Sequence, residues 1–301
     1  MPAISVVVPC YNGGKYLDQL TACLARQTFR DFEVVIVDDA SNDGTTRAKL
    51  AALDPAIRVV RHPENRRMAA ARNTGFSYAR ADFVMVLDCD DQLEPTYLEE
   101  TFAVLQSAPQ DAGFAFTHDR QTGTRQQSKK NYFNVFDALF KFTTGYAMLI
   151  RKAAWQKAGG YDETMRDGYE DWEFNLRLIR AGYHGIEIPK PLFIYNVSMQ
   201  GMMMSHSSRM HAVLWRRIRH RHAELYRISN LIRLYRENRT ARSELSPLYA
   251  IAALILTSVI PDSWYSALIH FVRSRRLLRS DELSASAARH ASLRPGARPT
   301  R

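Results

Sequence analysis

An apolar run that ends in three carboxylates is the feature that most constrains this chain. The run, Phe83 to Leu87, shows no polar alternation, so it predicts a strand covered on both faces, as in a parallel sheet. Asp88, Asp90 and Asp91 follow at once, where open α/β sheets bind their ligands. The pattern predicts either a site for Mg²⁺ or Mn²⁺, to which Asp-x-Asp offers hard oxygen ligands, or a solvated acidic turn.

Three further apolar runs precede this one and alternate with helix-forming segments. The runs Ile4 to Val8, Phe32 to Val37 and Ile57 to Arg61 are rich in β-branched residues, which favour strands. Apolar residues at helical spacing follow the first run, and an alanine-rich segment follows the third. Such alternation is typical of a parallel sheet built from right-handed crossovers.

The second of these runs also ends in acids. Asp39 follows it directly, and a carboxylate there can accept hydrogen bonds from a base or from ribose hydroxyls. The alternative is that Ser41 or Asp43 is merely a helix N-cap, and we expect both roles on different residues. Arg72, in the alanine-rich segment, has the planar fork that pairs with a phosphate.

Charge is divided unevenly along the chain. Through Ser208 there are 23 Lys and Arg against 25 Asp and Glu, whereas from Arg209 onward 18 Arg face 6 acids. The whole chain has 46% hydrophobic residues, enough to bury a full core, and its near-neutral first part is typical of a globular enzyme body. The last part is a basic module that would attract anionic partners such as lipid headgroups or nucleic acid.

The cysteines and the apolar segments indicate a location. Cys10, Cys23 and Cys89 are odd in number and lack metal-ligand spacing, which fits a reducing compartment and argues against a disulfide framework or a zinc site. The first strand follows with no signal peptide before it, and the longest run free of charge, Leu245 to Pro261, is shorter than the ~20 residues of a spanning helix.

Several blocks in order over residues 4 to 182 resemble the inverting nucleotide-sugar glycosyltransferases of family 2, which have the GT-A fold. The blocks are VVVPCYN at 6–12, VDDASNDGT at 37–45, NRRMAAARN at 65–73, LDCDD at 87–91, TGYAML at 144–149, AGGYDE at 158–163 and GYEDWE at 168–173. The resemblance implies an α/β GT-A fold with a mostly parallel, Rossmann-like central sheet flanked by helices. The charge and apolar pattern add a basic helical extension at the C-terminus. We divide the chain into a catalytic domain at 1–208, with a nucleotide-binding half at 1–91 and an acceptor half at 92–208, a basic helical region at 209–280 and a disordered tail at 281–301.

The resemblance also implies roles for single residues. The donor-binding residues would be Pro9, Tyr11, Asp39, Arg72 and Asp88. Asp90 would be the main metal ligand, with Asp88 facing the ribose or the metal, and the cofactor would be Mg²⁺ or Mn²⁺. The metal would stabilise the leaving nucleoside diphosphate, where charge develops in the reaction.

A sugar hydroxyl is a poor nucleophile until its proton is removed, so the reaction needs a general base. Glu170 and Asp171 precede apolar residues at helical spacing, so they lie in the first turn of a helix, where acids also complement the helix dipole. The resemblance makes Asp171 the base, with Glu170 contacting the acceptor or supporting the base.

Two positions depart from the family pattern. Arg67 stands where a glycine is common, which would change the donor fit or add a phosphate contact. After Tyr195, where relatives often place Arg and His, this chain has a methionine-rich segment that ends in His206. His206 would either replace the missing ligand or be an exposed loop histidine, and the methionines would form a lid over substrate or simply pack.

Beyond Arg209 the resemblance fades and the physical pattern remains. One apolar face is predicted across an Arg-rich segment from Leu214, Ile218, Leu225, Ile228, Ile232 and Tyr235. Further apolar segments at Leu248 to Ile260 and Trp264 to Val272 have Trp, Tyr and Arg at their borders. These features suit a membrane interface; the alternative is that the helices cover the catalytic domain or form a dimer contact.

Together these features predict a metal-dependent glycosyltransferase (EC 2.4). It would transfer a sugar, from a UDP-sugar in the first place, to a glycan or lipid-linked glycan at the cytoplasmic face of the membrane, in bacterial surface polysaccharide synthesis. A nucleic-acid-binding protein is the rival class, but the body lacks a recognition motif for nucleic acid, and we expect no such partner. A non-catalytic sugar-nucleotide binder is the third reading.

Overall fold

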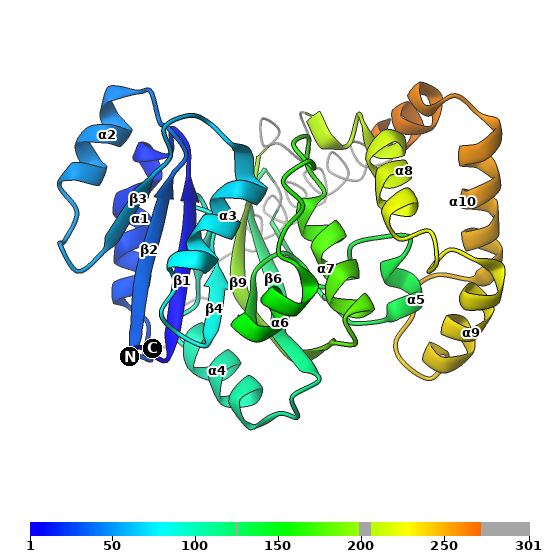
Figure 1. The fold of residues 1–301 in the computed structure, drawn as a ribbon, viewed down its shortest axis with the longest axis horizontal. Helices are drawn as coiled ribbons and strands as arrows, with labels where there is room; N and C mark the ends of the chain where they lie inside the picture. Colours follow the sequence, from blue (N-terminus) through cyan, green and yellow to red (C-terminus); the bar gives the residue numbers. More distant parts are fainter. Residues whose placement is uncertain (125, 199–205, 272–301) are drawn as a thin grey trace, which may run out of the picture.

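Parallel strands form the first half of the central sheet (Figure 1). The computed structural model describes residues 1–124, 126–198 and 206–271. The parallel strands are β1 (Ile4–Cys10), β2 (Phe32–Asp38), β3 (Arg58–Arg61) and β4 (Phe83–Val86). The helices between them are α1 (Gly14–Ala25), α2 (Gly44–Ala51) and α3 (Arg67–Tyr78). The predicted strands and helices of this half are therefore present, in the order β3-β2-β1-β4.

Pro9 and Cys10 lie inside β1, although the sequence predicts that the strand ends at Val8. Pro9 is opposite Val37 of β2. A proline removes one ladder hydrogen bond from a central strand. The strand β4 pairs with β1 only as far as Val7, so Pro9 has a strand neighbour on one side alone and the missing N–H is tolerated.

The second half of the sheet is mixed. Its strands are β5 (Gln92–Leu93), β6 (Ala112–Gly123), β7 (Gln127–Lys129), β8 (Met148–Arg151) and β9 (His184–Val197). β8 lies antiparallel between β4 and β6, β9 is parallel to β6, and β5 is antiparallel to β9. The prediction of a mostly parallel sheet is thus wrong for this half, because the alternation of strand and crossover helix that justified it stops after β4.

Two apolar layers cover the two faces of the sheet. Val6 and Val8 of β1 belong to one buried cluster, and Val7 belongs to the other. The first cluster includes α1 and α4 (Tyr97–Ser107), and the second includes α3, α6 (Lys152–Ala158) and α7 (Glu170–Arg180). Because both faces are covered, the central strands are apolar throughout, as their sequences predict.

The C-terminal helices pack on the catalytic part of the molecule. They are α8 (His211–Arg221), α9 (Ile228–Asn238) and α10 (Pro247–Val259), beside the short α5 (Val135–Ala138) (Figure 1). The indole of Trp215 and the hydroxyl of Tyr226 both donate to the carbonyl of Leu139, at 3.0 and 2.5 Å. Trp172 of α7 lies in the same buried cluster as Trp215.

The single apolar face predicted for this region is wrong. Leu214 and Ile218 are buried, whereas Ile228 is 77% exposed and Ile232 47% exposed. The reason is that α8 ends at Arg221 and α9 begins only at Ile228, so the two segments are separate helices with their own orientations.

Within the described residues, no helix is long and apolar enough to cross a membrane. The predicted tail at 281–301 and the end of the basic region lie outside the described residues.

A close approach of α3 to β1 leads to the first prediction. A Cβ at Gly75 would stand 2.1 Å from a methyl carbon of Val7, whereas a Cβ at Gly44 would meet nothing within 4 Å. Gly75→Ala should therefore destabilise the fold by about 1–3 kcal/mol through overpacking, and Gly44→Ala should be neutral or slightly stabilising. Urea unfolding of both variants measures this, and equal stability of the two would contradict the predicted packing.

Candidate active site

Acids from two strand ends stand on either side of β1. Asp39 follows β2, and Asp88, Asp90 and Asp91 follow β4. Because β2 and β4 are the parallel neighbours of β1, their carboxyl ends lie at the same edge of the sheet. The fold therefore brings together the two acidic groups that the sequence places apart.

Asp39 is held by three donors. It is 3% exposed, and its two oxygens accept the backbone N–H groups of Arg66 and Arg67, each at 2.8 Å. The Nδ1 atom of His62 lies 2.6 Å from Oδ1, and its Nε2 atom lies 2.9 Å from the hydroxyl of Thr74. Asp39 thus fixes the start of α3, and His62, to which the sequence analysis assigns no role, fixes Asp39.

Arg67 adopts the left-handed conformation that glycine prefers. Its φ is 74°, at the position where the family pattern favours glycine. Such a conformation costs a non-glycine residue roughly 1–2 kcal/mol. The hydrogen bond from its backbone N–H to Asp39 holds it in place. Strained backbone of this kind is common where a ligand binds.

The other residues predicted to hold the nucleoside surround this point. Pro9 is the last residue but one of β1, beside the end of β2, and Tyr11 is 47% exposed in the loop that follows. The side-chain carbonyl oxygen of Asn65 is buried and has no hydrogen-bond partner among the described residues. An acceptor without a donor in a buried position is open to a ligand's N–H or O–H group. Asp43 caps α2 by accepting the N–H of Thr46 at 2.7 Å, so the capping role expected in this block falls on Asp43.

The three acids after β4 have different environments. Asp91 is 2% exposed and accepts the N–H of Asn196 at 2.7 Å and the hydroxyl of Tyr146. Burial, together with the charges of Asp90 and Asp88, raises the pKa of Asp91 well above its usual value. Its position is therefore that of a structural acid, which ties the end of β4 to β9.

Asp90 and Asp88 fit a divalent cation. Burial and then the charge of Asp88 raise the pKa of Asp90 to about 6, so the negative charge of Asp90 is disfavoured in the absence of a cation. A cation compensates that charge, and carboxylates are the ligands that Mg²⁺ and Mn²⁺ prefer. Among the described residues no group of three or more His, Cys, Asp or Glu side chains could hold a metal ion, so the remaining ligands would come from the donor's phosphates and water.

Arg72 links the strand tip to the first turn of α7. It is 2% exposed. Its Nη2 atom lies 3.1 Å from Asp88 Oδ1, and its Nη1 atom lies 2.9 Å from Glu170 Oε1. The rings of Tyr146 and Tyr161 stand 5.2 and 5.5 Å from the guanidinium carbon. Burial alone would lower the pKa of Arg72, but Asp88 and Glu170 raise it, so this cation stays charged inside the protein.

Glu170 and Asp171 begin α7, as the helical spacing predicts. Burial raises the pKa of Glu170 to about 7, and Arg72 opposes the rise. The pKa of Asp171 is also raised by burial, with Arg72 lowering it and Asp88 raising it. Asp171 Oδ1 accepts the N–H of Trp172 at 2.7 Å. Glu170 is thus engaged by Arg72, and Asp171 is within electrostatic reach of the same strand tip.

The sequence analysis assigns no role to two further residues of the site, Tyr146 and Asn73. Tyr146 accepts the N–H of Asp88 at 3.2 Å and donates to Asp91. Asn73 accepts the N–H of Tyr161 at 2.8 Å and donates to its carbonyl at 2.9 Å, which ties α3 to the loop before α7. Both residues lie in sequence blocks that the resemblance includes, but a block does not say which of its members touch each other.

His206 lies beside the loop before α7. Its Nε2 atom is 3.2 Å from Asp167 Oδ1, and its side chain is 51% exposed. This is the environment of the exposed loop histidine that the sequence offered as an alternative to a ligand. The methionines at 199 and 202–204 lie outside the described residues.

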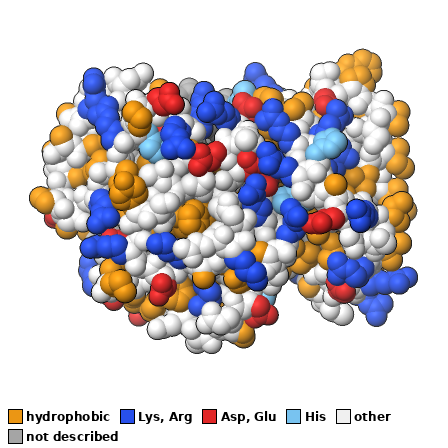
Figure 2. All heavy atoms as spheres, viewed as in Figure 1, with side chains coloured by type: hydrophobic (Ala, Val, Ile, Leu, Met, Phe, Trp, Pro, Cys, Tyr) orange, Lys and Arg blue, Asp and Glu red, His pale blue; other side chains and the backbone are white. Residues whose placement is uncertain are grey.

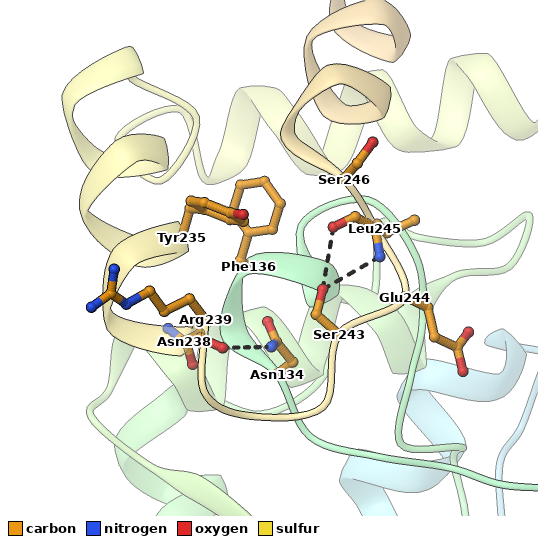
Figure 3. A pocket seen from close by; sticks show the side chains of 9 residues that line it. All are labelled: Asn134, Phe136, Tyr235, Asn238, Arg239, Ser243, Glu244, Leu245 and Ser246. Carbon is orange, nitrogen blue, oxygen red and sulfur yellow. Dashed lines mark hydrogen bonds between the residues drawn. The ribbon is translucent and has the colours of Figure 1, made fainter.

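A separate pocket of about 330 Å³ lies between α5, α9 and the loop that leads to α10 (Figure 3). Phe136, Tyr235 and Leu245 give it an apolar side, and Asn134 and Arg239 a polar one. None of the predicted site residues lines it, so it is distinct from the edge of the sheet where the acids gather.

Comparison with known proteins identifies relatives and folds. The family model described as glycosyl transferase family 2 matches residues 5–162, and one described as glycosyltransferase like family 2 matches residues 111–243. Glycosyltransferase GlyG of Streptococcus pneumoniae is 30% identical over 177 residues, which are 57% of this chain and 52% of GlyG. This chain therefore spans about half the length of that relative.

Two solved structures share the fold. The structure of S. aureus TarS 1-349 in complex with UDP-GlcNAc has a TM-score of 0.62 at 19% identity and covers 95% of this chain and 92% of TarS 1-349. The mannosyltransferase PcManGT from Pyrobaculum calidifontis, in complex with GDP-Man and Mn²⁺, has a TM-score of 0.54 at 19% identity and covers 94% and 86%. These likenesses confirm the α/β GT-A type of fold. Because the first family model matches more than half of the chain, this protein belongs to glycosyl transferase family 2, which confirms the predicted enzyme class.

Proposed function

We propose that this chain transfers a sugar from a nucleoside diphosphate donor to a hydroxyl of a glycan or lipid-linked glycan, with inversion at the anomeric carbon. The observation that carries the proposal is the Arg72 bridge, with Nη2 on Asp88 and Nη1 on Glu170. The bridge joins the acids that would hold the donor to the helix turn that would hold the base. Transfer needs both groups at one reacting centre.

The donor would bind at the edge of the sheet. Asp39, with Pro9 and Tyr11, would hold the nucleoside, and the free acceptor of Asn65 adds a hydrogen-bonding group there. Asp90 and Asp88 would hold Mg²⁺ or Mn²⁺, which neutralises the diphosphate as it leaves. TarS 1-349 was solved with UDP-GlcNAc and PcManGT with GDP-Man and Mn²⁺. We take a UDP-sugar as the first candidate for this chain.

The acceptor would be activated by Asp171. A base must be deprotonated to take the hydroxyl proton, and it must have a lone pair free to do so. Glu170 is paired with Arg72. The Oδ1 atom of Asp171 accepts a hydrogen bond from the backbone N–H of Trp172, which leaves the carboxylate of Asp171 with lone pairs that could take the proton. Glu170 would then position the acceptor or support the base. The family resemblance supports a role in bacterial surface polysaccharide assembly, and the relative GlyG is itself a glycosyltransferase of a bacterium.

The C-terminal helices would bind an anionic membrane surface. Large apolar side chains are exposed on α10 and the segment after it: Leu248, Tyr249, Ile251, Ile255, Leu256, Val259, Trp264, Leu268 and Phe271. Figure 2 shows hydrophobic side chains gathered along the edge of the molecule that α10 forms. Residues 209–271 carry 10 Arg against 4 acids. Apolar area next to excess positive charge is the combination that binds anionic lipid.

A donor panel tests the proposed activity. Wild-type protein with Mn²⁺ or Mg²⁺ should be thermally stabilised by one nucleotide sugar, since a ligand of the folded state raises the melting temperature, and should release its nucleoside diphosphate slowly. Asp90→Asn should lose the metal-dependent part of the stabilisation. Asp171→Asn should keep donor binding and lose about 10²- to 10⁴-fold in transfer.

The control for these variants is Asp111→Asn, which alters an exposed acid before β6 and should change neither donor binding nor transfer. Full activity of Asp171→Asn would remove the assigned base. No stabilisation of the wild-type protein by any donor would contradict the proposal and favour a non-enzymatic role.

The pH dependence tests the role of Arg72. The positive charge of Arg72 lowers the pKa of Asp171 and of Glu170, so a base in this network loses its proton more readily than it would without that charge. Arg72→Met should raise the pKa of the base and shift the acidic limb of kcat/KM to higher pH, and Arg72→Lys should shift it less. A lower rate with an unmoved limb in both variants would show that Arg72 has only a structural role.

Vesicle binding tests the membrane surface. The protein should co-float with vesicles that contain phosphatidylglycerol and not with vesicles of phosphatidylcholine alone. Replacing Ile251 and Ile255 by Gln should weaken binding at least about tenfold, because two apolar side chains are lost from the interface. The matched control is Val59→Gln, at an exposed apolar position of β3. A dimer that these substitutions dissociate, without vesicle binding, would show instead that a second copy covers this face.

A further inference from the structure

Two thiols lie together beside the carboxylates of the candidate site. Cys10 ends β1, and Cys89 stands between Asp88 and Asp90. A Cβ placed on Gly13 would be 2.6 Å from the sulfur of Cys89 and 3.1 Å from the sulfur of Cys10. Both sulfurs therefore lie near the same point and near each other. A side chain at position 13 would collide with them, so only glycine fits there.

The ends of two neighbouring strands explain this juxtaposition. β1 and β4 pair as far as Val7 and Val86, and Cys10 and Cys89 each follow that last pair by three residues, Cys89 in the turn beyond β4. Both side chains also pack in the same apolar layer, so they are on one side of the sheet.

We propose that Cys10 and Cys89 are an oxidisable thiol pair, and that their disulfide closes the donor site. The third cysteine is excluded from this pair because its sulfur is buried and hydrogen-bonded to the backbone of Leu93. The consequence for activity rests on the proposed function, whereas the formation of the disulfide does not.

The chemistry needs a peroxide as oxidant. One thiol of the pair attacks the peroxide, the O–O bond breaks, and the products are a sulfenic acid on that cysteine and water or an alcohol. The sulfur of the other cysteine then attacks the sulfenic sulfur, the S–O bond breaks, and the S–S bond forms with release of water. Two thiols are oxidised by two electrons in total and the peroxide is reduced. A dithiol reverses the step by thiol–disulfide exchange.

A disulfide here would displace the metal-binding acids. The two sulfurs would have to come to about 2.05 Å from each other, and any backbone movement of Cys89 that this requires carries its neighbours Asp88 and Asp90 with it. Asp91 is fixed on the other side by Asn196 and Tyr146, so the distortion falls on the turn between them. A shift of about 1 Å at a reacting centre can cost about a hundredfold in rate.

Peptide mapping tests the pair directly. The full chain is treated with hydrogen peroxide, free thiols are blocked by alkylation, and peptides are compared with and without reductant. The expected result is a cross-linked peptide that joins Cys10 to Cys89, absent from Cys10→Ser and Cys89→Ser and retained in the matched control Cys23→Ser. Absence of this cross-link, or oxidation of the two thiols only to sulfinic acids, would overturn the proposal.

The activity arm uses the donor that the panel identifies. Oxidation should lower nucleoside diphosphate release at least about tenfold, and dithiothreitol should restore it. Cys89→Ser should show no such response relative to its own unoxidised rate. A cross-link that leaves the rate unchanged would overturn the gating role. A cross-link in a protein that uses no donor even when reduced would show that the proposed function fails while the thiol chemistry stands.

Discussion

The buried guanidinium of Arg72 is the interaction on which the candidate site depends. A cation removed from water must be compensated by charge and hydrogen bonds in good geometry. Asp88 and Glu170 provide the opposite charges and Tyr146 and Tyr161 provide ring faces. Asp88 follows β4 and Glu170 begins α7. Tyr146 lies just before β8, and Tyr161 lies in the loop before α7. The contacts that compensate this one cation therefore hold together segments that are far apart in the sequence.

The charge balance of this network supports the proposal that a divalent cation binds in the donor site. Arg72 is shared by Asp88 and Glu170, and Asp90 and Asp171 add further acidic groups nearby, with raised pKa values that come first from burial. A nucleoside diphosphate is itself anionic. A cation between its phosphates and the carboxylates would remove the repulsion between them. The proposed metal dependence would thus be a consequence of packing acids behind a single arginine.

The nucleotide-binding half of the fold could be predicted from the sequence because its signal is local. Each apolar strand is followed by polar residues and a helix, and parallel strands joined by crossovers place those polar residues at one edge. The acceptor half could not be predicted, because β8 pairs antiparallel with β4 from about 60 residues away. The periodicity of a strand does not predict which strand pairs with it or whether the pairing is parallel or antiparallel. The same limit applies to α8 and α9, whose apolar residues continue in sequence while the chain turns between them.

The site residues fall into the same two groups: those with a local signal in the sequence and those defined by contacts with distant residues. Asp39 and Asp90 are predictable because they follow apolar strands, and Asp171 because the family resemblance adds to its place in the first turn of a helix; the structure has all three at those positions. His62 and Tyr146 were not selected, because their roles exist only through contacts with residues far away in the chain, at Asp39 and Asp91. Arg67 is intermediate: the family pattern marks its position as one for glycine, and the φ of 74° gives the physical reason.

The three acids after β4 make different contacts because they have different environments. They are neighbours in sequence and would be interchangeable in solution. Asp91 is enclosed and accepts from Tyr146 and Asn196, so it connects β4 to the end of β9. Asp88 faces Arg72 and through it α7. Asp90 makes neither contact and retains the free oxygens that a ligand needs. Because Asn196 is the last residue but one of β9, the contact with Asp91 fixes where that strand ends.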